Sequence, residues 1–376
     1  MHEGLIGTRM ASRFVFFTKT AWHEPPRLRH QLAQLLAADG SEVLFAEKPG
    51  LLERPPATGE VPSRIRLFRH RELLHHKLRI GPPLRGLNRA WTAPSIRRSA
   101  STLGIAREDV IVNFNYEYYF LRDLFPGNAI VTIINDDFIA RALPLCKETL
   151  HEAQRMTCRA SDAVLTPSVV LQEQLRPYCE PQLFLPWADT PFRQASDSTK
   201  RDTVLYWGFI DWRLDYAFME SLARRLAEVA PEVQFLFVGP TERGSDQQAL
   251  FRAHPNVRLA PSSKLDALPL DRIFASVIPF RGGVEGCDAI VMPNKAFQLL
   301  ARGIPLLVTG MPRFAQEPFV FRLDQGDAVA SVLRSREQFA SLQAGMRTFI
   351  DGNGPAGRLQ QFRAIVEDAR RARTNP

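Results

Sequence analysis

The sequence is poor in cysteine and has no long hydrophobic segment. Its four cysteines are scattered, and none forms a Cys-x-x-Cys pair: Cys146, Cys158, Cys179 and Cys287. This pattern argues against a disulfide scaffold, a cysteine zinc site and thioredoxin-type chemistry, and it makes a reducing cytoplasm the expected compartment. The longest apolar runs, such as residues 129–134, are far shorter than the roughly 18 residues of a membrane span. Residues 14–17 have the length of a strand, so we expect neither a signal peptide nor a membrane-spanning helix.

Lysine is also scarce, although the protein is basic. The chain has 48 Lys+Arg against 40 Asp+Glu, a net charge of +8, and only 7 of the basic residues are lysine. Arginine binds phosphate and carboxylate groups through a flat fork of several donors. A GC-rich genome would produce the same bias, so the composition is compatible with an anionic ligand without requiring one.

The length and the pattern of apolar runs indicate two α/β domains. A chain of 376 residues is too long for one compact core. A content of 45% apolar and 23% charged residues is typical of folded domains. Short β-rich runs alternate with helical segments, and in the first half the predicted strands are residues 14–17, 43–47, 65–68, 110–115, 129–135, 163–167 and 183–185. Most of these runs are continuously apolar, which predicts a doubly wound parallel sheet covered on both faces.

The pattern breaks at residues 185–191 and starts again after a polar run. In the second half the predicted strands are residues 203–207, 233–238, 257–259, 276–278 and 305–309. We therefore predict four parts: an N-terminal Rossmann-like domain that binds the acceptor, a linker, a C-terminal Rossmann-like domain that binds the donor, and a closing helix, at residues 1–190, 191–202, 203–354 and 355–376. Two such domains are expected to face each other across a cleft, where ligands bind at the carboxyl ends of the strands.

The basic charge is concentrated in residues 64–98. This stretch holds ten Lys/Arg and one acid, Glu72, so its net positive charge is about as large as that of the whole chain. Its charges are too dense for Glu72 alone to neutralise, and apolar residues are interleaved with them. Such a stretch suits a membrane surface or an anionic ligand; a solvated loop and helix face is the alternative. The residues expected to make this contact are Arg79, Arg85, Arg89 and Trp91.

One motif points to a family. Residues 276–280 (Ser-Val-Ile-Pro-Phe) and residues 292–305 (Met-Pro-Asn-Lys-Ala-Phe-Gln-Leu-Leu-Ala-Arg-Gly-Ile-Pro) resemble the donor site of GT-B glycosyltransferases. That site has a strand ending in Pro-Phe, a loop, Pro-x-Lys, an aromatic residue, an acid or amide and a helix ending in Ala-x-Gly. Weaker similarities lie in residues 22–30, 135–138, 204–210, 238–240 and 256–261. The resemblance implies a GT-B fold and a glycosyltransferase activity of the EC 2.4 class.

The resemblance also implies how the donor is bound. GT-B enzymes usually use a cationic side chain and a helix N-terminus, without a metal, to stabilise the nucleoside diphosphate that leaves. Lys295 is expected in this role, and Gly208 is expected to let the diphosphate approach closely. We expect a UDP-sugar as donor and no other cofactor. The predicted donor-binding residues are Gly208, Phe209, Arg213, Gly239, Lys264, Arg281, Asn294, Lys295 and Gln298.

Two positions depart from the pattern of many retaining members of the family. Those enzymes have a Glu three residues after the lysine and another eight residues earlier, where this chain has Gln298 and Ile290. The arrangement is similar to xanthan-type glucuronosyltransferases and to teichuronic-acid-type transferases. The xanthan-type enzymes attach to the cytoplasmic face of the membrane and use lipid-diphosphate-linked acceptors. The resemblance therefore implies a glycan or lipid-linked acceptor at a membrane surface.

An inverting transfer needs a general base that deprotonates the acceptor hydroxyl. Asp136 and Asp137 end the predicted strand at residues 129–135 on its carboxyl side. We favour Asp137 as the base, with Asp136 as the substitute; His23 and Glu117 are weaker candidates. The alternative is that the aspartate caps the following segment.

Two other functions stay open on the sequence. A GT-B-fold UDP-sugar epimerase would need no separate acceptor, but the basic stretch argues against it. A non-enzymatic binder of nucleotides or of an anionic polymer would need no base. No recognition helix or aromatic–basic motif points to nucleic acid as a partner.

Overall fold

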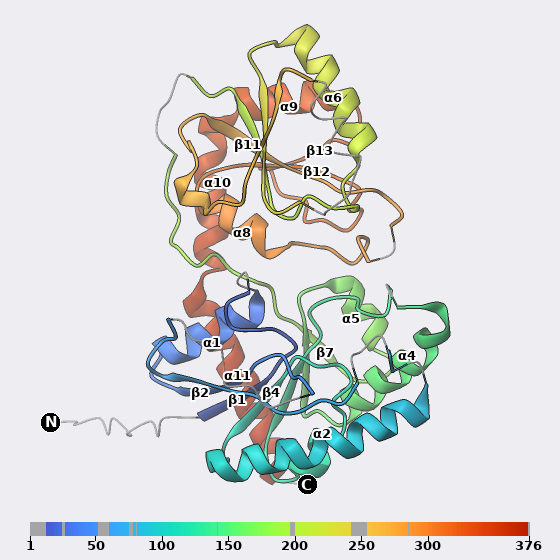
Figure 1. Cartoon of the computed structure of the whole chain (residues 1–376). Helices are drawn as coiled ribbons and strands as arrows, with labels where there is room; N and C mark the ends of the chain where they lie inside the picture. Colours follow the sequence, from blue (N-terminus) through green and yellow to red (C-terminus); the bar gives the residue numbers. More distant parts are fainter. Residues whose placement is uncertain are drawn as a thin grey trace, which may run out of the picture. The chain divides into compact units, whose positions relative to one another are not determined.

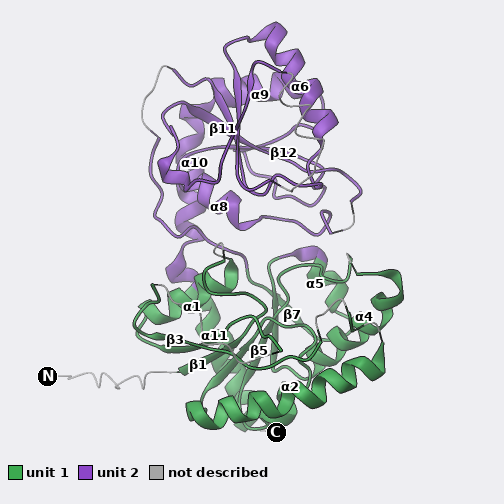
Figure 2. Cartoon of the chain, in the orientation of Figure 1, with its two compact units in different colours: residues 1–167, 171–184, 359–376 green, residues 168–170, 185–358 purple. Residues whose placement is uncertain are grey.

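The computed structural model divides the chain into two compact units, which we describe separately (Figure 2). Unit 1 comprises residues 1–167, 171–184 and 359–376, and unit 2 comprises residues 168–170 and 185–358. The structure describes residues 13–24, 27–51, 60–74, 78–79, 81–140, 142–195, 200–241, 254–284 and 286–374. Within these residues no helix is both long enough and apolar enough to cross a membrane.

Unit 1 is built on a parallel sheet of seven strands in the order β3-β2-β1-β4-β5-β6-β7. The strands are β1 (Arg13–Phe17), β2 (Glu42–Ala46), β3 (Ile65–Phe68), β4 (Val110–Asn113), β5 (Ile130–Ile133), β6 (Ala163–Thr166) and β7 (Pro181–Leu183). The helices are α1 (Leu28–Ala38), α2 (Pro82–Leu103), α3 (Leu121–Leu124), α4 (Pro144–Arg159), α5 (Val169–Leu175) and, at the end of the chain, α11 (Pro355–Thr374). The residues of β4 and β5 are all buried, as expected for central strands covered on both faces.

Unit 2 repeats this architecture with six parallel strands in the order β10-β9-β8-β11-β12-β13. Its strands are β8 (Thr203–Trp207), β9 (Gln234–Val238), β10 (Val257–Ala260), β11 (Ile273–Pro279), β12 (Leu306–Thr309) and β13 (Val320–Arg322). Its helices are α6 (Tyr216–Val229), α8 (Asn294–Leu300), α9 (Ala328–Glu337) and α10 (Phe339–Gly352), with a 3₁₀ turn η2 (Leu265–Ala267). In both units the first six strands follow the 3-2-1-4-5-6 order of the Rossmann fold. The predicted α/β, doubly wound class is therefore confirmed.

Most predicted strands are present with ends shifted by a few residues. The largest differences are in β7, which begins two residues before the predicted 183, and in β11, which begins three residues before the predicted 276. The edge strand β13 was not predicted. It has only three residues, too few for a period-2 pattern to stand out from a turn.

The C-terminal helix packs on the first unit, and not on the unit that precedes it in the sequence (Figure 1). The ring of Phe362 lies 6.0 Å from that of Phe14 and 5.9 Å from that of Phe184. Gln361 Nε2 donates to Leu183 O over 2.9 Å, and Arg363 forms an ion pair with Asp39. The predicted closing helix therefore exists, but residues 359–376 complete the core of the N-terminal domain.

Candidate donor site and the buried charges of the first unit

Two strands of unit 2 end in glycines that pack against each other. Gly208 follows β8 with φ +150°, and Gly239 follows β9 with φ +155°. A Cβ atom on Gly239 would collide with the carbonyl oxygen of Gly208. The Gly208 amide donates to Val238 O over 3.0 Å. Glycine is favoured at both turns because other residues rarely adopt such φ values, and at Gly239 a side chain also has no room. The result is an open backbone edge at the carboxyl end of the sheet.

Lys295 lies against this edge, and its amine contacts two aromatic rings. It is the second residue of α8, and its Nζ lies 4.7 Å from the ring centre of Tyr206 and 4.8 Å from that of Phe280. A Cβ on Gly208 would be 3.5 Å from the same Nζ. Among the described residues no carboxylate lies within ion-pair distance of Lys295. The amine is therefore held over a glycine turn with no counterion among the described residues.

The surroundings of Lys295 favour its neutral form while the site is empty. Burial lowers the pKa of its amine to about 7, and the nearby charge of Arg213 lowers this pKa further, while Asp211 opposes the shift. A bound anion would favour the ammonium form and raise the pKa again. Binding of an anion beside this amine would therefore be coupled to uptake of a proton.

Arg213 is already partly neutralised. Its Nε donates to Asp211 Oδ1 over 2.9 Å, and its Nη2 donates to Asp211 Oδ2 over 2.6 Å. The guanidinium also lies 5.5 Å from the ring centre of Phe280. Sequence reasoning missed Asp211, although an acid two residues before a candidate phosphate ligand could have suggested this pairing. Only the remaining amino group of Arg213 is left for a ligand.

The other predicted donor residues divide into buried and exposed groups. Asn294 has a buried side-chain oxygen without a hydrogen-bond partner. Gln298 is buried, and its Nε2 donates to Asp189 Oδ2 over 3.0 Å and to Trp187 O over 3.4 Å. The exposed residues follow the carboxyl ends of β8, β10 and β11: Phe209, Lys264 and Arg281. The structure thus brings Gly208, Gly239, Arg213, Asn294 and Lys295 into one region, while the amide nitrogen of Gln298 faces Trp187 and Asp189, which precede the first strand of the same unit.

In unit 1, Asp136 and Asp137 follow β5 as predicted. Asp137 Oδ1 accepts a hydrogen bond from the Ala140 amide over 2.9 Å. Asp137 therefore makes a hydrogen bond of the capping type, but it stabilises a turn and not the helix that the capping alternative assumed. In the part of the chain that the structure describes, the other carboxylate oxygen of Asp137 makes no hydrogen bond. Asp136 is exposed.

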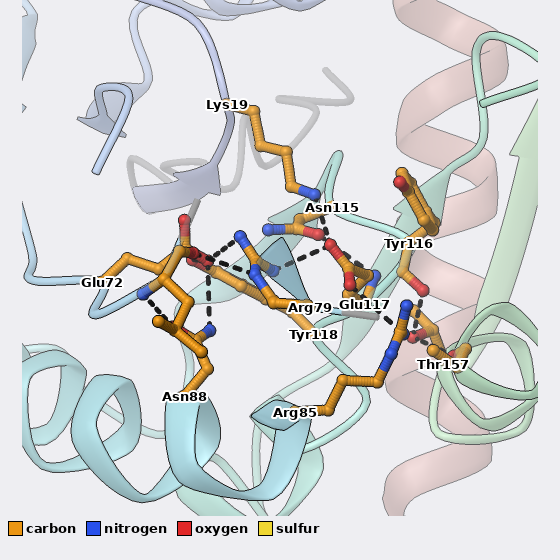
Figure 3. A network of polar contacts seen from close by, with 12 residues as sticks. Lys19, Glu72, Arg79, Arg85, Asn88, Asn115, Tyr116, Glu117, Tyr118 and Thr157 are labelled. Carbon is orange, nitrogen blue, oxygen red and sulfur yellow. Dashed lines mark hydrogen bonds and ion pairs between the residues drawn. The ribbon is translucent and has the colours of Figure 1, made fainter. Parts of the chain in front are cut away.

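The basic stretch is partly neutralised, and most of the carboxylates that pair with it come from outside it, contrary to the expectation. Arg79 is only 3% exposed and binds Glu117 over 2.8 Å and Glu72 over 2.9 Å. Arg85 binds the other oxygen of Glu117 over 3.2 Å, and Lys19 binds Glu117 over 2.7 Å. Figure 3 shows these cations gathered around the Glu117 carboxylate. The predicted contact of Arg79 with a membrane is wrong, because a buried guanidinium cannot reach a lipid surface.

The remaining residues of the stretch lie nearer the surface. Arg89 pairs with Asp123 over 2.7 Å, with both side chains well exposed. Trp91 is 45% exposed. Arg85 is mostly buried, and two of its nitrogens have no hydrogen-bond partner. The histidines of the stretch at positions 75 and 76 lie outside the described residues.

Glu117 is a poor candidate for a general base. Burial by itself would raise the pKa of its carboxyl, but Lys19, Arg79 and Arg85 outweigh burial and lower this pKa to about 2. A carboxylate held so firmly in its ionised form has little tendency to accept a proton. Glu117 therefore acts as the centre of a structural ion network.

Comparison with known proteins gives matches only among solved structures. No protein-family model and no curated protein matches the chain. HepE of Anabaena, in complex with UDP and glucose, has a TM-score of 0.65 at 9% identity, over 95% of this chain and 99% of that chain. The UDP-forming α,α-trehalose-phosphate synthase of Burkholderia vietnamiensis has a TM-score of 0.63 at 11% identity, over 95% and 99%.

A third match is longer than this protein. TarM of S. aureus, in a complex that includes UDP and α-GlcNAc-glycerol, has a TM-score of 0.56 at 7% identity. The match covers 73% of this chain but only 58% of TarM, so the chain spans less than two thirds of that structure. At such low identities these likenesses establish the fold alone. Together with the two Rossmann-type sheets, they show that the chain has the GT-B fold of glycosyltransferases.

Proposed function

We propose that the protein is a glycosyltransferase of the EC 2.4 class that moves a sugar from a UDP-sugar to a glycan or lipid-linked acceptor, without a metal ion, in the synthesis of a surface polysaccharide or glycoconjugate. The observation that carries the proposal is Lys295, whose amine lies over the Gly208 turn with no carboxylate partner among the described residues. Two structures with the same fold, HepE and TarM, are complexes with UDP, which supports this choice of nucleotide.

In the proposed reaction Lys295 binds the diphosphate. Negative charge builds on the leaving phosphate oxygen as the sugar is transferred, and a cation placed there in advance stabilises that charge. The open Gly208 turn lets the diphosphate approach the backbone. Gln298 would bind the ribose through its side-chain oxygen, because its side-chain nitrogen already donates a hydrogen bond to Asp189.

For an inverting transfer the proposed base is Asp137. Its Oδ1 is held by the Ala140 amide, which fixes the orientation of the carboxylate. The second oxygen is the one that would accept the proton of the acceptor hydroxyl. Asp136, next to it and exposed, is the substitute.

We expect Lys295→Ala to weaken UDP binding by about ten- to a hundredfold, because it removes a charge-assisted contact of about 1.5–3 kcal/mol. Isothermal titration calorimetry measures this change. The matched control is Arg258→Ala, which removes an exposed cation from the edge strand β10 and should leave UDP binding unchanged. Equal affinity of wild type and Lys295→Ala would refute the assignment.

The same titration gives a second readout of Lys295. Because the pKa of the free amine is about 7 and a bound diphosphate raises it, UDP binding near pH 8 should take up a proton. The affinity should then fall as the pH rises above 7, by at most about tenfold per pH unit. Titrations in buffers of different ionisation enthalpy measure the uptake, which should disappear in Lys295→Ala.

We also propose that the protein works at the cytoplasmic face of an anionic membrane. Leu87 and Trp91 are half exposed one helical turn apart on α2, where they could enter the lipid interface beside Arg89. The double variant Leu87→Ser/Trp91→Ser should lower binding to vesicles of phosphatidylcholine and phosphatidylglycerol by about tenfold. The control is Val229→Ser, which changes an exposed apolar residue of unit 2. If Leu87→Ser/Trp91→Ser and Val229→Ser both float with the vesicles to the same extent as wild type, the surface around Leu87 and Trp91 is not the membrane-binding surface.

A further inference from the structure

Unit 1 contains a cavity of about 530 Å³. Its lining comes from the segments that follow the carboxyl ends of neighbouring strands, with Thr20 after β1, Lys48 after β2, Glu72 after β3 and Phe114 after β4. The volume is in the range of sites that bind small molecules, and the carboxyl edge is where open α/β sheets bind ligands. This cavity lies in the unit that does not carry Lys295.

The charges of the cavity lining are strongly unbalanced. Among the described residues one carboxylate lines it, that of Glu72, against five cations: Lys19, Arg27, Arg29, Lys48 and Arg79. Lys19 and Arg79 are paired with Glu117, as described above, and exposed Arg27 lies 3.8 Å from Glu24. Within the described residues Arg29 and Lys48 have no carboxylate within ion-pair distance. Two cations of the lining are thus left without a counterion, one of them deep in the protein.

Arg29 is the buried one. It is only 4% exposed, and its guanidinium lies 5.6 Å from the ring centre of Phe114. One amino group donates to Thr20 Oγ1, while Nε is buried without a hydrogen-bond partner. Burial lowers the pKa of the guanidinium to about 10, so it still carries its charge at neutral pH. Glu24 and Asp136 oppose this shift electrostatically, but among the described residues neither lies within ion-pair distance of Arg29. A buried charge without a direct counterion destabilises the fold, which indicates that the direct counterion comes from a ligand.

We propose that this cavity binds a phosphate or diphosphate group of the acceptor, with Arg29 as the buried contact and Lys48 as the contact at the rim. The inference rests on the proposed function, since it assigns a chemical class to the acceptor. Arginine forks match phosphate oxygens, and several cations around one site favour a multiply charged group over a single carboxylate. The apolar part of the lining, which includes Leu73, Leu74 and Phe138, would contact the sugar or lipid attached to the phosphate.

The test uses inorganic pyrophosphate and the full chain saturated with UDP, so that the donor site is occupied. Arg29→Gln and Lys48→Gln should each weaken pyrophosphate binding by about tenfold or more, and Arg29→Gln by up to about a hundredfold. Both variants should bind UDP as wild type does. The control is Arg66→Gln, which removes an exposed arginine of β3 outside the cavity and should change neither affinity.

Thermal unfolding without any ligand separates a binding role of Arg29 from a structural one. If the role of Arg29 is to bind an anionic ligand, Arg29→Gln should raise the melting temperature of the ligand-free protein, because the substitution removes a buried charge that has no direct counterion. Pyrophosphate should then stabilise wild type and Arg66→Gln but not Arg29→Gln. Lys48 is exposed, so Lys48→Gln reports on binding even if Arg29→Gln folds poorly.

Two further probes identify the source of the phosphate. One is glucose 6-phosphate in solution, and the other is phosphatidylcholine vesicles containing a long-chain prenyl phosphate. If either probe binds wild type, and Arg29→Gln and Lys48→Gln weaken that binding, the result supports the proposal and identifies the source of the phosphate. The proposal is overturned if pyrophosphate binds wild type, Arg29→Gln and Lys48→Gln equally, or if malonate binds as tightly as pyrophosphate. A failure of UDP binding would instead count against the proposed function. In that case pyrophosphate binding is compared between wild type, Arg29→Gln and Lys48→Gln in the background of Lys295→Ala, so that the outcome does not depend on UDP.

Discussion

Replacing Glu117 with glutamine should lower the free energy of unfolding by about 3–5 kcal/mol, the usual result of breaking a buried ion pair by removing one partner. Glu117 is 5% exposed and lies within 3.2 Å of nitrogens of Lys19, Arg79 and Arg85. Glutamine keeps the shape of the side chain but not its charge. The three cations would then be left with Glu72 as their one carboxylate in the network. Urea unfolding at neutral pH measures the loss.

The pKa of Glu117 adds a pH dependence to this prediction. The folded protein lowers this pKa to about 2, from 4.5 in an ordinary glutamate, so the ionised form is favoured by folding. Its contribution to stability is fully present above about pH 4.5 and is lost as the pH falls towards 2. The wild type should therefore lose stability in this window more steeply than Glu117→Gln does.

The matched control is Asp123→Asn in the same unit. Asp123 and Arg89 form an ion pair of similar length, but both side chains are well exposed. Exposed pairs contribute about 0–1 kcal/mol, so this variant should stay close to wild type. If both variants lose the same small amount, the Glu117 network contributes no more than a surface pair, and our interpretation of it is wrong.

Asp137→Asn should lower turnover by about 10²–10⁴-fold while UDP binding is unchanged, because it removes a general base and leaves the donor site intact. Asparagine can still accept the hydrogen bond of the Ala140 amide through its side-chain oxygen. The turn should therefore keep its conformation, which separates loss of basicity from loss of structure. Release of UDP in the presence of EDTA measures turnover and at the same time tests the proposed independence from metal.

Asp136→Asn serves as the comparison. An inactive Asp136→Asn with normal turnover in Asp137→Asn would move the role of base to the neighbouring residue. Normal turnover in both variants would exclude this pair as the source of the base. An assay with the UDP-sugar alone, without an acceptor, detects the isomerised donor that an epimerase would release.

The periodicity of the sequence was enough to predict the class of the fold and most of its strands. A parallel strand covered on both faces has to be apolar along its whole length, and a central strand such as β4 meets this condition with four buried residues. The Gly208 turn and the segment around Lys295 were also predicted, because these residues are close in sequence to the strands that position them. Such local constraints can be recognised without knowledge of distant contacts.

Tertiary structure decided which distant residues meet. The apolar stripe of α11 predicted a helix, but a stripe does not specify its partner, and the helix packs against Phe14 at the other end of the chain. The excess positive charge of residues 64–98 appeared to need an external anion until the fold placed Glu117 beside Arg79. Conversely, Arg29 was not predicted from the sequence, because its burial without a carboxylate within ion-pair distance among the described residues is a property of the fold. Electrostatic free energy depends on distance and burial in three dimensions, and neither quantity can be obtained from the spacing of residues along the chain.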